Sequence, residues 1–287
     1  MDATPAQAAT PPVKSALDAH VEGLLAAARE EVRNRRVTPT ATYRVQLHAG
    51  FRFDDARAIV PYLAKLGITD LYTSPYLKAA PGSTHGYDIV DHSQLNPEIG
   101  PDDDHEAMLA ALREHGLGLL LDVVPNHMGI LGNENPWWND VLENGQASIF
   151  AGSFDIDWAA PTRPESRGRV LLPILGGLYG DVLEGGELKL ARDGGSFHVA
   201  YHEHRFPLDP RSYQAVLEPA LGPIVAALGP EADETLEFQS ILTAVRNLPA
   251  HDETDPPRVA ERHREKEIVK RRLATLLESS PAAAAAV

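Results

Sequence analysis

The sequence predicts an α/β protein that is built around a parallel β-sheet. Between residues 42 and 124, three short apolar segments alternate with two segments of helical periodicity, which is typical of consecutive βαβ units with right-handed crossovers. The third segment, residues 118–124, is almost purely apolar, as expected for a strand that is buried on both faces. Polar residues follow the second and third segments, at the sheet edge where parallel α/β proteins bind ligands.

Two segments precede the predicted sheet. Residues 1–12 are rich in Ala, Thr and Pro and lack the basic and apolar regions of a signal peptide, so we predict a disordered tail. Residues 13–32 carry apolar side chains at helical spacing. We predict that residues 13–40 form an amphipathic helix that packs against the outside of the main domain. A membrane-surface helix is less consistent with its mixture of acidic and basic residues.

Residues 41–127 are predicted to form the first three βα units of the domain. Residues 42–47 alternate apolar and more polar side chains, as a half-buried strand does. A helix should begin near Asp54 and end at Gly67. Because Pro61 lacks an amide hydrogen, we expect it to kink or restart this helix.

The next strand is predicted at residues 68–74 and is followed by a long loop. A helix should then begin at residues 102–104 and end at Gly116. The apolar segment 118–124 completes the three parallel strands.

The pattern changes after His127. Residues 128–215 contain all three tryptophans of the chain, many Gly and Pro residues, and three strand-like pieces at residues 169–175, 183–190 and 197–201. We predict that they form a small β-rich subdomain, inserted after the third strand.

Residues 216–287 return to helical periodicity, most clearly in residues 259–277. The last residues, 281–287, are Ala-rich and are expected to lack a cap. Three parallel strands cannot close a barrel and make a poor free-standing sheet. We therefore expect either that further strands follow Val287 in a longer parent chain, or that another element covers the open edge.

The composition excludes several classes of function. Among 287 residues, 43% are hydrophobic, which suffices for one large core or two modest ones. A net charge of −15 disfavours nucleic acid and anionic membranes as partners and suits a neutral ligand. The absence of cysteine excludes disulfides, thiolate metal sites and cysteine nucleophiles. No apolar run is long enough to span a bilayer, so we predict a soluble, cytoplasmic protein.

Two polar clusters carry the candidate chemistry. Residues 82–88 read Gly-Ser-Thr-His-Gly-Tyr-Asp, and residues 122–127 read Asp-Val-Val-Pro-Asn-His. An aromatic ring beside a carboxylate suits a sugar, because the ring stacks on C–H groups and the carboxylate accepts hydrogen bonds from hydroxyls. Each cluster alone is also explained by an ordinary polar turn. Both follow parallel strands, however, and should converge at one edge of the sheet.

These residues resemble the α-amylase superfamily of glycoside hydrolases. A closer resemblance is to the maltooligosyl trehalose synthases, and it extends from about Ala41 to the end of the chain. Besides the two clusters, it is carried by residues 42–47 (TYRVQL), 60–63 (VPYL), 71–75 (LYTSP), 136–145 (PWWNDVLENG), 154–158 (FDIDW) and 202–205 (HEHR).

The resemblance implies that the chain is the N-terminal part of a (β/α)8 TIM barrel with a β-rich subdomain inserted after the third strand. It implies the activity of a (1→4)-α-D-glucan 1-α-D-glucosylmutase. Such an enzyme converts the reducing-end α-1,4 linkage of a maltooligosaccharide into an α,α-1,1 linkage. A carboxylate attacks the anomeric carbon while a carboxylic acid protonates the leaving oxygen. Released glucose is the acceptor, so water must be excluded, and the inserted subdomain is the expected lid.

The resemblance also implies roles for individual residues. Tyr87 would stack on the sugar, His127 would donate to its primary hydroxyl, and Asp88 and Asp122 would organise the polar network around them. Asn126 stands where many amylases bind calcium, but partner ligands cannot be identified, so we predict no metal and no cofactor. The remaining substrate-binding candidates are His85 and, in the insertion, Tyr179, His202 and His204; for histidines in loops, plain solvation is the alternative.

The catalytic carboxylates are expected to lie beyond Val287. In the family that this sequence resembles, the nucleophilic Asp follows the fourth strand of the barrel. The acid Glu follows the fifth strand, and a further Asp follows the seventh. A retaining reaction needs two carboxyl groups about 5–5.5 Å apart, so we expect the 287-residue chain to be inactive alone. The acidic residues of the C-terminal region follow no predicted strand and are interpreted as solvated charges; they are Asp233, Glu234, Glu237, Asp252, Glu253 and Asp255.

Two other functions stay open at this point. An α-glucan hydrolase of the same superfamily would share the two clusters, but should lack the segments at residues 137–138 and 154–158. A carbohydrate-binding remnant would keep Tyr87 and His127 without any chemistry. An in-frame continuation of the coding sequence would favour the enzyme, whereas a natural stop codon would favour the remnant.

Overall fold

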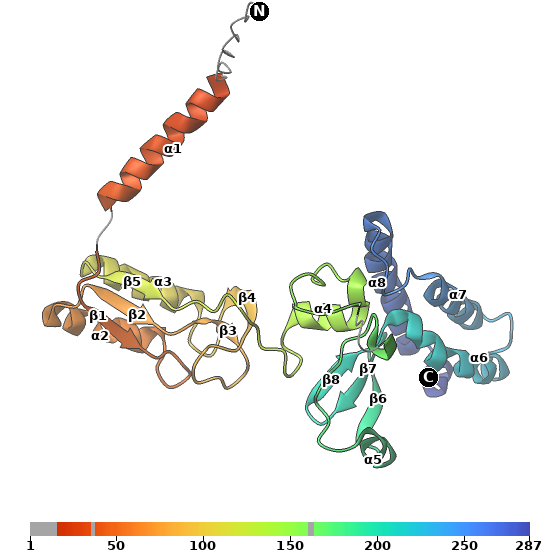
Figure 1. The fold of residues 1–287 in the computed structure, drawn as a ribbon. Coiled ribbons are helices and arrows are strands. Elements are labelled where there is room, and N and C mark those ends of the chain that lie inside the picture. The colour runs from red at the N-terminus through yellow and green to blue at the C-terminus, as the bar shows by residue number, and fades with distance from the viewer. Residues whose placement is uncertain (1–15, 36–37, 160–163) are drawn as a thin grey trace, which may run out of the picture.

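The computed structural model describes residues 16–35, 38–159 and 164–287. Figure 1 shows two groups of packed elements, joined by an extended segment, and a helix at the N-terminal end that stands apart from both. The predicted tail, residues 1–12, and the first residues of the predicted N-terminal helix, 13–15, lie outside the described residues.

The N-terminal helix, α1, runs from Ala16 to Arg35. Its described side chains, residues 17–33, are all exposed, including Leu17 and Leu24. The prediction that this helix packs against the main domain is therefore wrong. The helices α2 (Phe53–Leu66) and α3 (Asp102–Glu114) already cover one face of the parallel sheet and bury their own apolar side chains there.

The first group of elements contains the predicted parallel sheet. Its strands are β1 (Thr42–Val45), β2 (Asp70–Thr73) and β5 (Gly118–Leu121), in the order β1-β2-β5. Both pairings are parallel, with Arg44 opposite Tyr72 and Tyr72 opposite Leu120. The three predicted strands and their parallel arrangement are thus confirmed.

Two helices pack on one face of this sheet. They are α2 (Phe53–Leu66) and α3 (Asp102–Glu114), and their buried side chains share one core with Leu71 of β2. The helix α2 ends at Gly67 in a left-handed conformation (φ 86°), as predicted. It continues through Pro61 rather than restarting there, because Val60 and Leu63 beside it are fully buried.

The long loop predicted after β2 contains a β-hairpin. Its strands are β3 (Leu77–Ala79) and β4 (Ile89–Leu95), which pair antiparallel with irregular register. The pattern of β4 does not alternate: Ile89, Val90 and Asp91 are all buried, and the following residues are more exposed. A strand of this kind has no period-two signal in the sequence.

The segment after β5 contains helices as well as strands. The predicted strand at residues 197–201 is confirmed within the strand Ser196–Tyr201. The strand predicted at 169–175 is wrong, because Pro173 cannot donate a ladder hydrogen bond and the segment is irregular. The one predicted at 183–190 is wrong in its first half. The elements are α4 (Pro136–Asn144), the 3-10 turns η1 (Gly145–Ala147) and η2 (Pro164–Ser166), α5 (Tyr179–Glu184), β6 (Leu188–Asp193), β7 (Ser196–Tyr201) and β8 (His204–Pro207).

The strands β6, β7 and β8 form an antiparallel sheet in that order. The chain then turns helical, as predicted, and one core joins Phe197 of β7 with the C-terminal helices. The Ser280 hydroxyl accepts a hydrogen bond from Ala283 N at 3.4 Å and so caps the N-terminus of the last helix. The elements are η3 (Pro210–Ser212), α6 (Tyr213–Leu228), α7 (Asp233–Asn247), α8 (Pro256–Ser279) and α9 (Pro281–Ala286).

A buried polar network ties α8 to α4 and η3. The side chain of Arg262 is fully buried and donates to Pro249 O at 2.6 Å, Asp209 Oδ1 at 2.7 Å, and two acceptors of α4 at 3.2 Å. One turn further along α8, Lys266 Nζ donates to Glu143 Oε2 at 2.5 Å. Buried charges are tolerated only when paired and hydrogen-bonded in this way. Across the described residues, no helix is both long and apolar enough to cross a membrane.

Candidate carbohydrate site

The candidate site lies on the sheet face that α2 and α3 leave uncovered. Side chains alternate between the two faces of a strand, and Val45 and Leu71 point into the core with the helices. Arg44 and Tyr72 occupy the alternate positions and therefore face the other way. Asp122 joins them, because its backbone N–H donates to Thr73 O at 3.1 Å and so continues the ladder by one residue.

Four side chains form a hydrogen-bonded group on this face, which we call the Tyr87 cluster: Arg44, Tyr72, Tyr87 and Asp122. Three donors converge on Asp122 Oδ2, namely Tyr87 Oη at 2.5 Å, Arg44 at 3.2 Å and Tyr72 Oη at 3.3 Å. Arg44 also donates to Tyr87 Oη at 3.0 Å and lies over the Tyr72 ring, 4.7 Å from its centroid. The Tyr87 ring, which comes from a loop, is thereby held at a fixed position over the sheet edge.

The same contacts fix the protonation states of the cluster. The hydrogen bond from Tyr87, helped by Arg44 and Tyr72, lowers the pKa of Asp122 below its usual value. The hydrogen bond to Asp122 raises the pKa of Tyr87. At neutral pH, Asp122 is therefore ionised and Tyr87 keeps its proton, so the phenol is a donor to the carboxylate.

The loop that carries Tyr87 is shaped by a glycine. Gly86 has a φ of 75°, and a Cβ at this position would collide with the backbone carbonyl of Pro75. Gln46, directly after β1, anchors the loop, because its Nε2 donates to the carbonyls of Thr84 at 3.2 Å and His85 at 3.1 Å. The chain can therefore pass close to the strand end only with glycine at position 86.

His127 contacts the backbone of Tyr87, and Asp88 is the next residue in the chain. The imidazole Nε2 of His127 is 3.0 Å from Tyr87 O. Because a carbonyl only accepts, Nε2 carries the proton, and the neutral ring presents Nδ1 as an acceptor. Asp88 Oδ1 accepts from Ser83 Oγ at 2.5 Å and lies 3.7 Å from Nδ1 of His85. The structure thus brings Asp122, Tyr87 and His127 together, whereas Asp88 and His85 organise the loop itself.

A pocket continues from His127 toward α4. Asn135 caps α4 by accepting from Trp137 N and Trp138 N, both at 3.0 Å, and so fixes the backbone of the first turn that carries Trp137. One face of Trp137 stacks on Phe150, with centroids 4.9 Å apart and planes at 8°. The pocket has a volume of about 660 Å³ and is lined by His92, residues 123–128, Ile130, Trp137 and residues 153–155. Asn126 and His127 both belong to this lining.

The three weaker candidates from the later segment, Tyr179, His202 and His204, lie elsewhere. His204, at the start of β8, is close to the loop that leaves the site, with its Nδ1 3.4 Å from Gly132 N. Tyr179 is the first residue of α5 and is 63% exposed. His202 pairs with Glu187 at 3.1 Å. Among the described contacts, none joins Tyr179, His202 or His204 to the Tyr87 cluster.

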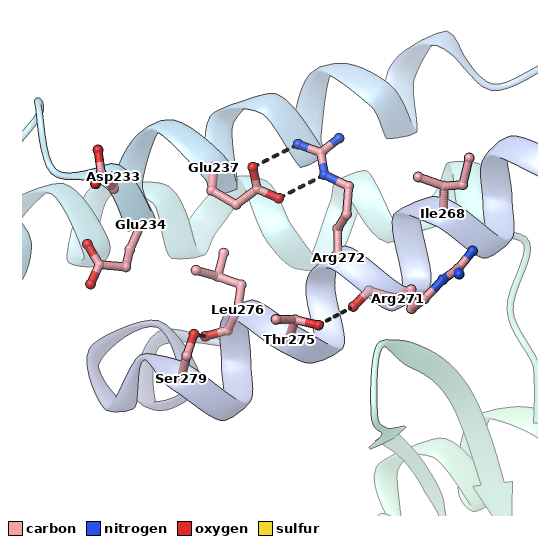
Figure 2. A pocket seen from close by; sticks show the side chains of 9 residues that line it. All are labelled: Asp233, Glu234, Glu237, Ile268, Arg271, Arg272, Thr275, Leu276 and Ser279. Carbon is pink, nitrogen blue, oxygen red and sulfur yellow. Dashed lines mark hydrogen bonds and ion pairs between the residues drawn. The ribbon is translucent and has the colours of Figure 1, made fainter.

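A second pocket, of about 430 Å³, lies between α7 and α8 and contains acidic residues considered above (Figure 2). Glu237 forms a bidentate ion pair with Arg272, in which Nε donates to Oε1 at 2.8 Å and Nη2 donates to Oε2 at 2.9 Å. This pairing lowers the pKa of Glu237. A carboxylate held ionised by arginine is a poor general acid, and Asp233 and Glu234 lie in the first turn of the same helix. This pocket therefore does not fit the pair of carboxyl groups that a retaining glycoside reaction needs.

The described part of the chain contains no group of three or more His, Asp or Glu side chains that could hold a metal ion. Asn126, the position where many amylases bind calcium, is exposed and lines the pocket beside His127.

Arg44 and Tyr72 were not predicted as site residues. Their contact with Asp122 depends on strand register, which a single sequence does not reveal. One signal was present: Arg44 and Gln46 are polar at alternate positions of an otherwise apolar strand. Side chains spaced by two residues point to the same face of a sheet, and the carboxyl end of a parallel strand is where such proteins bind ligands.

Comparisons with known proteins show what this chain is similar to. The family profile of the alpha amylase catalytic domain matches residues 58–180. A putative maltooligosyl trehalose synthase of Mycobacterium tuberculosis is 42% identical over 170 residues, which cover 54% of this chain and 22% of that protein. The maltooligosyltrehalose synthase structure from Arthrobacter ramosus aligns with a TM-score of 0.52 and 42% identity, over 60% of this chain and 21% of that one.

A third relative is more distant. The structure of a hypothetical maltooligosyl trehalose synthase from Sulfolobus tokodaii aligns with a TM-score of 0.51 and 33% identity, over 63% of this chain and 23% of that one. The chain spans about a fifth of the length of these relatives. The resemblance read from the sequence motifs is thus confirmed, and the chain is a homologue of the maltooligosyl trehalose synthases with a TIM-barrel-like α/β fold.

Proposed function

We propose that this chain forms the part of a maltooligosyl trehalose synthase that binds a glucose unit of the substrate. The reaction is the intramolecular transfer that turns the reducing-end α-1,4 linkage of a maltooligosaccharide into an α,α-1,1 linkage. The observation that carries the proposal is the Tyr87 ring, locked by Asp122 at the carboxyl edge of the parallel sheet. The 42% identity to synthases supports it. A neutral sugar also suits a chain with a net charge of −15.

In this proposal, Tyr87 stacks on the glucose unit whose linkage is cleaved. Asp122 and Arg44 act through Tyr87, because their hydrogen bonds end on its phenol and orient its ring. His127 lies beside the ring and offers Nδ1 to a sugar hydroxyl. A neutral His127 accepts from that hydroxyl, and donation to it, as the resemblance implies, requires the imidazolium form. Asn126 and Trp137 border the next part of the substrate groove.

Residues 128–215 are proposed to be an insertion after the third strand that closes over the sugar. Support comes from the pocket beside His127, whose wall includes Trp137 and residues 153–155, and from the contact between Gly132 and His204. Tyr179 and His204 would then lie on the closing segment. Closure matters because transfer succeeds only when glucose, rather than water, attacks the glycosyl-enzyme. The nucleophile and the acid are proposed to come from outside these 287 residues.

The function is tested with a chimera of the Arthrobacter ramosus synthase in which the aligned segment is replaced by the segment of this chain. We expect the chimera to consume the reducing ends of maltopentaose without releasing an equal amount of glucose. The Tyr87→Ala variant should lose at least about 100-fold in kcat/KM, as expected when a group that positions the reacting sugar is removed. The Tyr62→Ala variant, which removes an exposed tyrosine of α2, is the matched control.

Two results would contradict the proposal. Glucose released in proportion to the reducing ends consumed would indicate hydrolysis, and hence an α-glucan hydrolase. Equal activity of the Tyr87→Ala and Tyr62→Ala chimeras would show that the Tyr87 cluster does not hold the substrate.

A further inference from the structure

The pocket beside His127 lies between two segments of chain that are tied together. The side chain of Asn135, the residue that caps α4, donates to Gly129 O at 2.8 Å. This hydrogen bond joins the start of α4 to the loop that follows β5. The two walls of the pocket are therefore fixed relative to each other.

Two consecutive tryptophans of α4 position the second wall of the pocket. Trp137 stacks on Phe150, and Trp138 packs against Phe154 with ring centroids 5.0 Å apart. Aromatic pairs of this kind are favoured beyond the area that they bury. The segment from Phe150 to Phe154 is thus held at both ends, and it places the next residue, Asp155, on the lining of the pocket.

Among the described residues that line this pocket, Asp155 is the single carboxylate. It is exposed, and in the part of the chain that the structure describes its side chain makes no hydrogen bond or ion pair. A carboxylate accepts hydrogen bonds from sugar hydroxyls, while an aromatic face covers the C–H groups of the ring. Asp155 and Trp137 offer this pair of contacts, and apolar side chains such as Met128 and Ile130 complete the walls.

We propose that this pocket holds the glucose that is released when the substrate is cleaved, and that Asp155 and Trp137 bind it there. The inference rests on the proposed function and adds the residues that keep the acceptor in place. His127 lines the pocket and also contacts Tyr87, so the pocket adjoins the glucose unit that Tyr87 is proposed to hold. Its volume of about 660 Å³ lies in the range of sites that enclose a whole small ligand, which leaves room for the glucose to turn.

The chemistry of the transfer requires this turn. Cleavage leaves the glucose with a new hydroxyl at C4, whereas the α,α-1,1 product needs its C1 hydroxyl at the same reaction centre. In the transfer, the oxygen of the C1 hydroxyl forms a bond to the anomeric carbon of the glycosyl-enzyme, and the bond from this carbon to the enzyme carboxylate breaks. The hydroxyl proton passes to the second carboxylate, which acted as the acid during cleavage. A glucose that escapes before it turns leaves water as the acceptor.

The inference is tested in the chimera with the Arthrobacter ramosus synthase, by the ratio of free glucose to trehalose-ended product formed from maltopentaose. Asp155→Asn keeps the size of the side chain but removes its charge, and Trp137→Ala removes the stacking face. Each should raise the ratio at least about fivefold, because a lost hydrogen bond to a charged group or a lost aromatic contact weakens the binding of glucose by that factor or more. Trp137→Phe should restore most of the transfer.

Two variants are matched controls. Trp158→Ala removes a tryptophan that lines a different pocket, and Asp103→Asn removes an exposed charge in the first turn of α3. Both should keep the ratio of the unsubstituted chimera. Partial misfolding of a variant lowers the amount of both products but not their ratio, so a purely structural role of Asp155 or Trp137 would leave the ratio unchanged.

A second measurement follows binding to the 287-residue chain itself. Titration with D-glucose should shift the indole N–H signal of Trp137 in NMR spectra and leave that of Trp158 unchanged. Asp155→Asn should raise the dissociation constant for glucose at least about fivefold.

The failure of this inference differs from the failure of the proposed function. If the unsubstituted chimera releases one glucose for each reducing end consumed, the proposed function fails and the inference fails with it. If that chimera transfers glucose, but Asp155→Asn and Trp137→Ala keep its ratio, only the inference is overturned. A higher KM for maltopentaose at an unchanged ratio would then assign the pocket to another unit of the substrate chain. The absence of a glucose-induced shift at Trp137 would overturn the inference as well.

Discussion

The two groups of elements differ in how far their hydrogen-bonded polar side chains are exposed. In the C-terminal group, the side chain of Arg262 is fully buried and donates hydrogen bonds to Pro249 O and Asp209 Oδ1. In the sheet group, Arg44 also pairs with an aspartate, but its side chain is 37% exposed. The first network holds helices together, whereas the second leaves the face of an aromatic ring at the edge of an open sheet. Exposure, more than the number of hydrogen bonds, separates a network that supports the fold from one that is available to a ligand.

The largest expected effect comes from breaking the buried network. Arg262→Ala should destabilise the helical group by about 3–5 kcal/mol, because it leaves buried acceptors without a donor. Hydrogen exchange should show the loss of protection in α4 and α8 and no change in β1, β2 and β5. Arg264→Ala, at a side chain that is 64% exposed on the same helix, is the control and should cost less than about 0.5 kcal/mol. Equal effects of Arg262→Ala and Arg264→Ala would show that the buried network does not support the fold more than an exposed arginine does.

The next effect concerns the loop that presents Tyr87. Gly86→Ala should cost about 3 kcal/mol, because it combines a positive φ with a collision at the Pro75 carbonyl. Gly82→Ala is the matched control: it has the same φ of 75° but open space around the added Cβ, so it should cost only about 1 kcal/mol. Urea unfolding of the sheet group measures both. Similar losses would show that the close approach at Gly86 is not required.

A third prediction concerns how the stability of the C-terminal group of elements depends on pH. Burial raises the pKa of Tyr213 to about 12, and the hydroxyl accepts from Phe197 N at 3.2 Å. The folded chain therefore keeps this proton above pH 10, where the unfolded chain loses it. The contribution to stability is complete below pH 10 and disappears as the pH rises to about 12.

Tyr213→Phe isolates this contribution. It should cost about 1–3 kcal/mol at neutral pH, because Phe197 N–H loses its partner. Above pH 10, the difference in unfolding free energy between the natural chain and the variant should shrink. A difference that stays constant up to pH 12 would mean that Tyr213 titrates normally.

The smallest effect on stability should come from the open site. Tyr87→Phe removes a hydrogen bond in an exposed cluster and should cost less than about 1 kcal/mol. Its clearer signature is the pKa of Asp122, which should rise toward its usual value when the phenol donor is lost. The carboxyl signal of Asp122 in an NMR titration reports this shift, and Tyr62→Phe should leave it unchanged. The natural Asp122 contributes stability above its unfolded pKa, and this is lost as the pH falls through the lower folded pKa.

The sequence predicted those parts of the molecule whose signal is local. The three parallel strands follow from apolar runs between helices, and the meeting of Tyr87 with Asp122 follows from their place after neighbouring strands. The roles of Arg44 and Tyr72 depend on register, and the hairpin of β3 and β4 has no alternating pattern. The exposure of α1 was missed for another reason. An apolar stripe indicates that a helix has a partner but does not identify it.

The central claim is that the open sheet face, and not the helical group, binds the sugar. NMR spectra of the 287-residue chain titrated with maltopentaose test it directly. We predict shifts at Tyr87, His127 and Trp137, which weaken in Tyr87→Ala, and no shifts at Glu237 or Arg272. Shifts confined to the pocket between α7 and α8, or shifts at His127 that persist unchanged in Tyr87→Ala, would contradict the account.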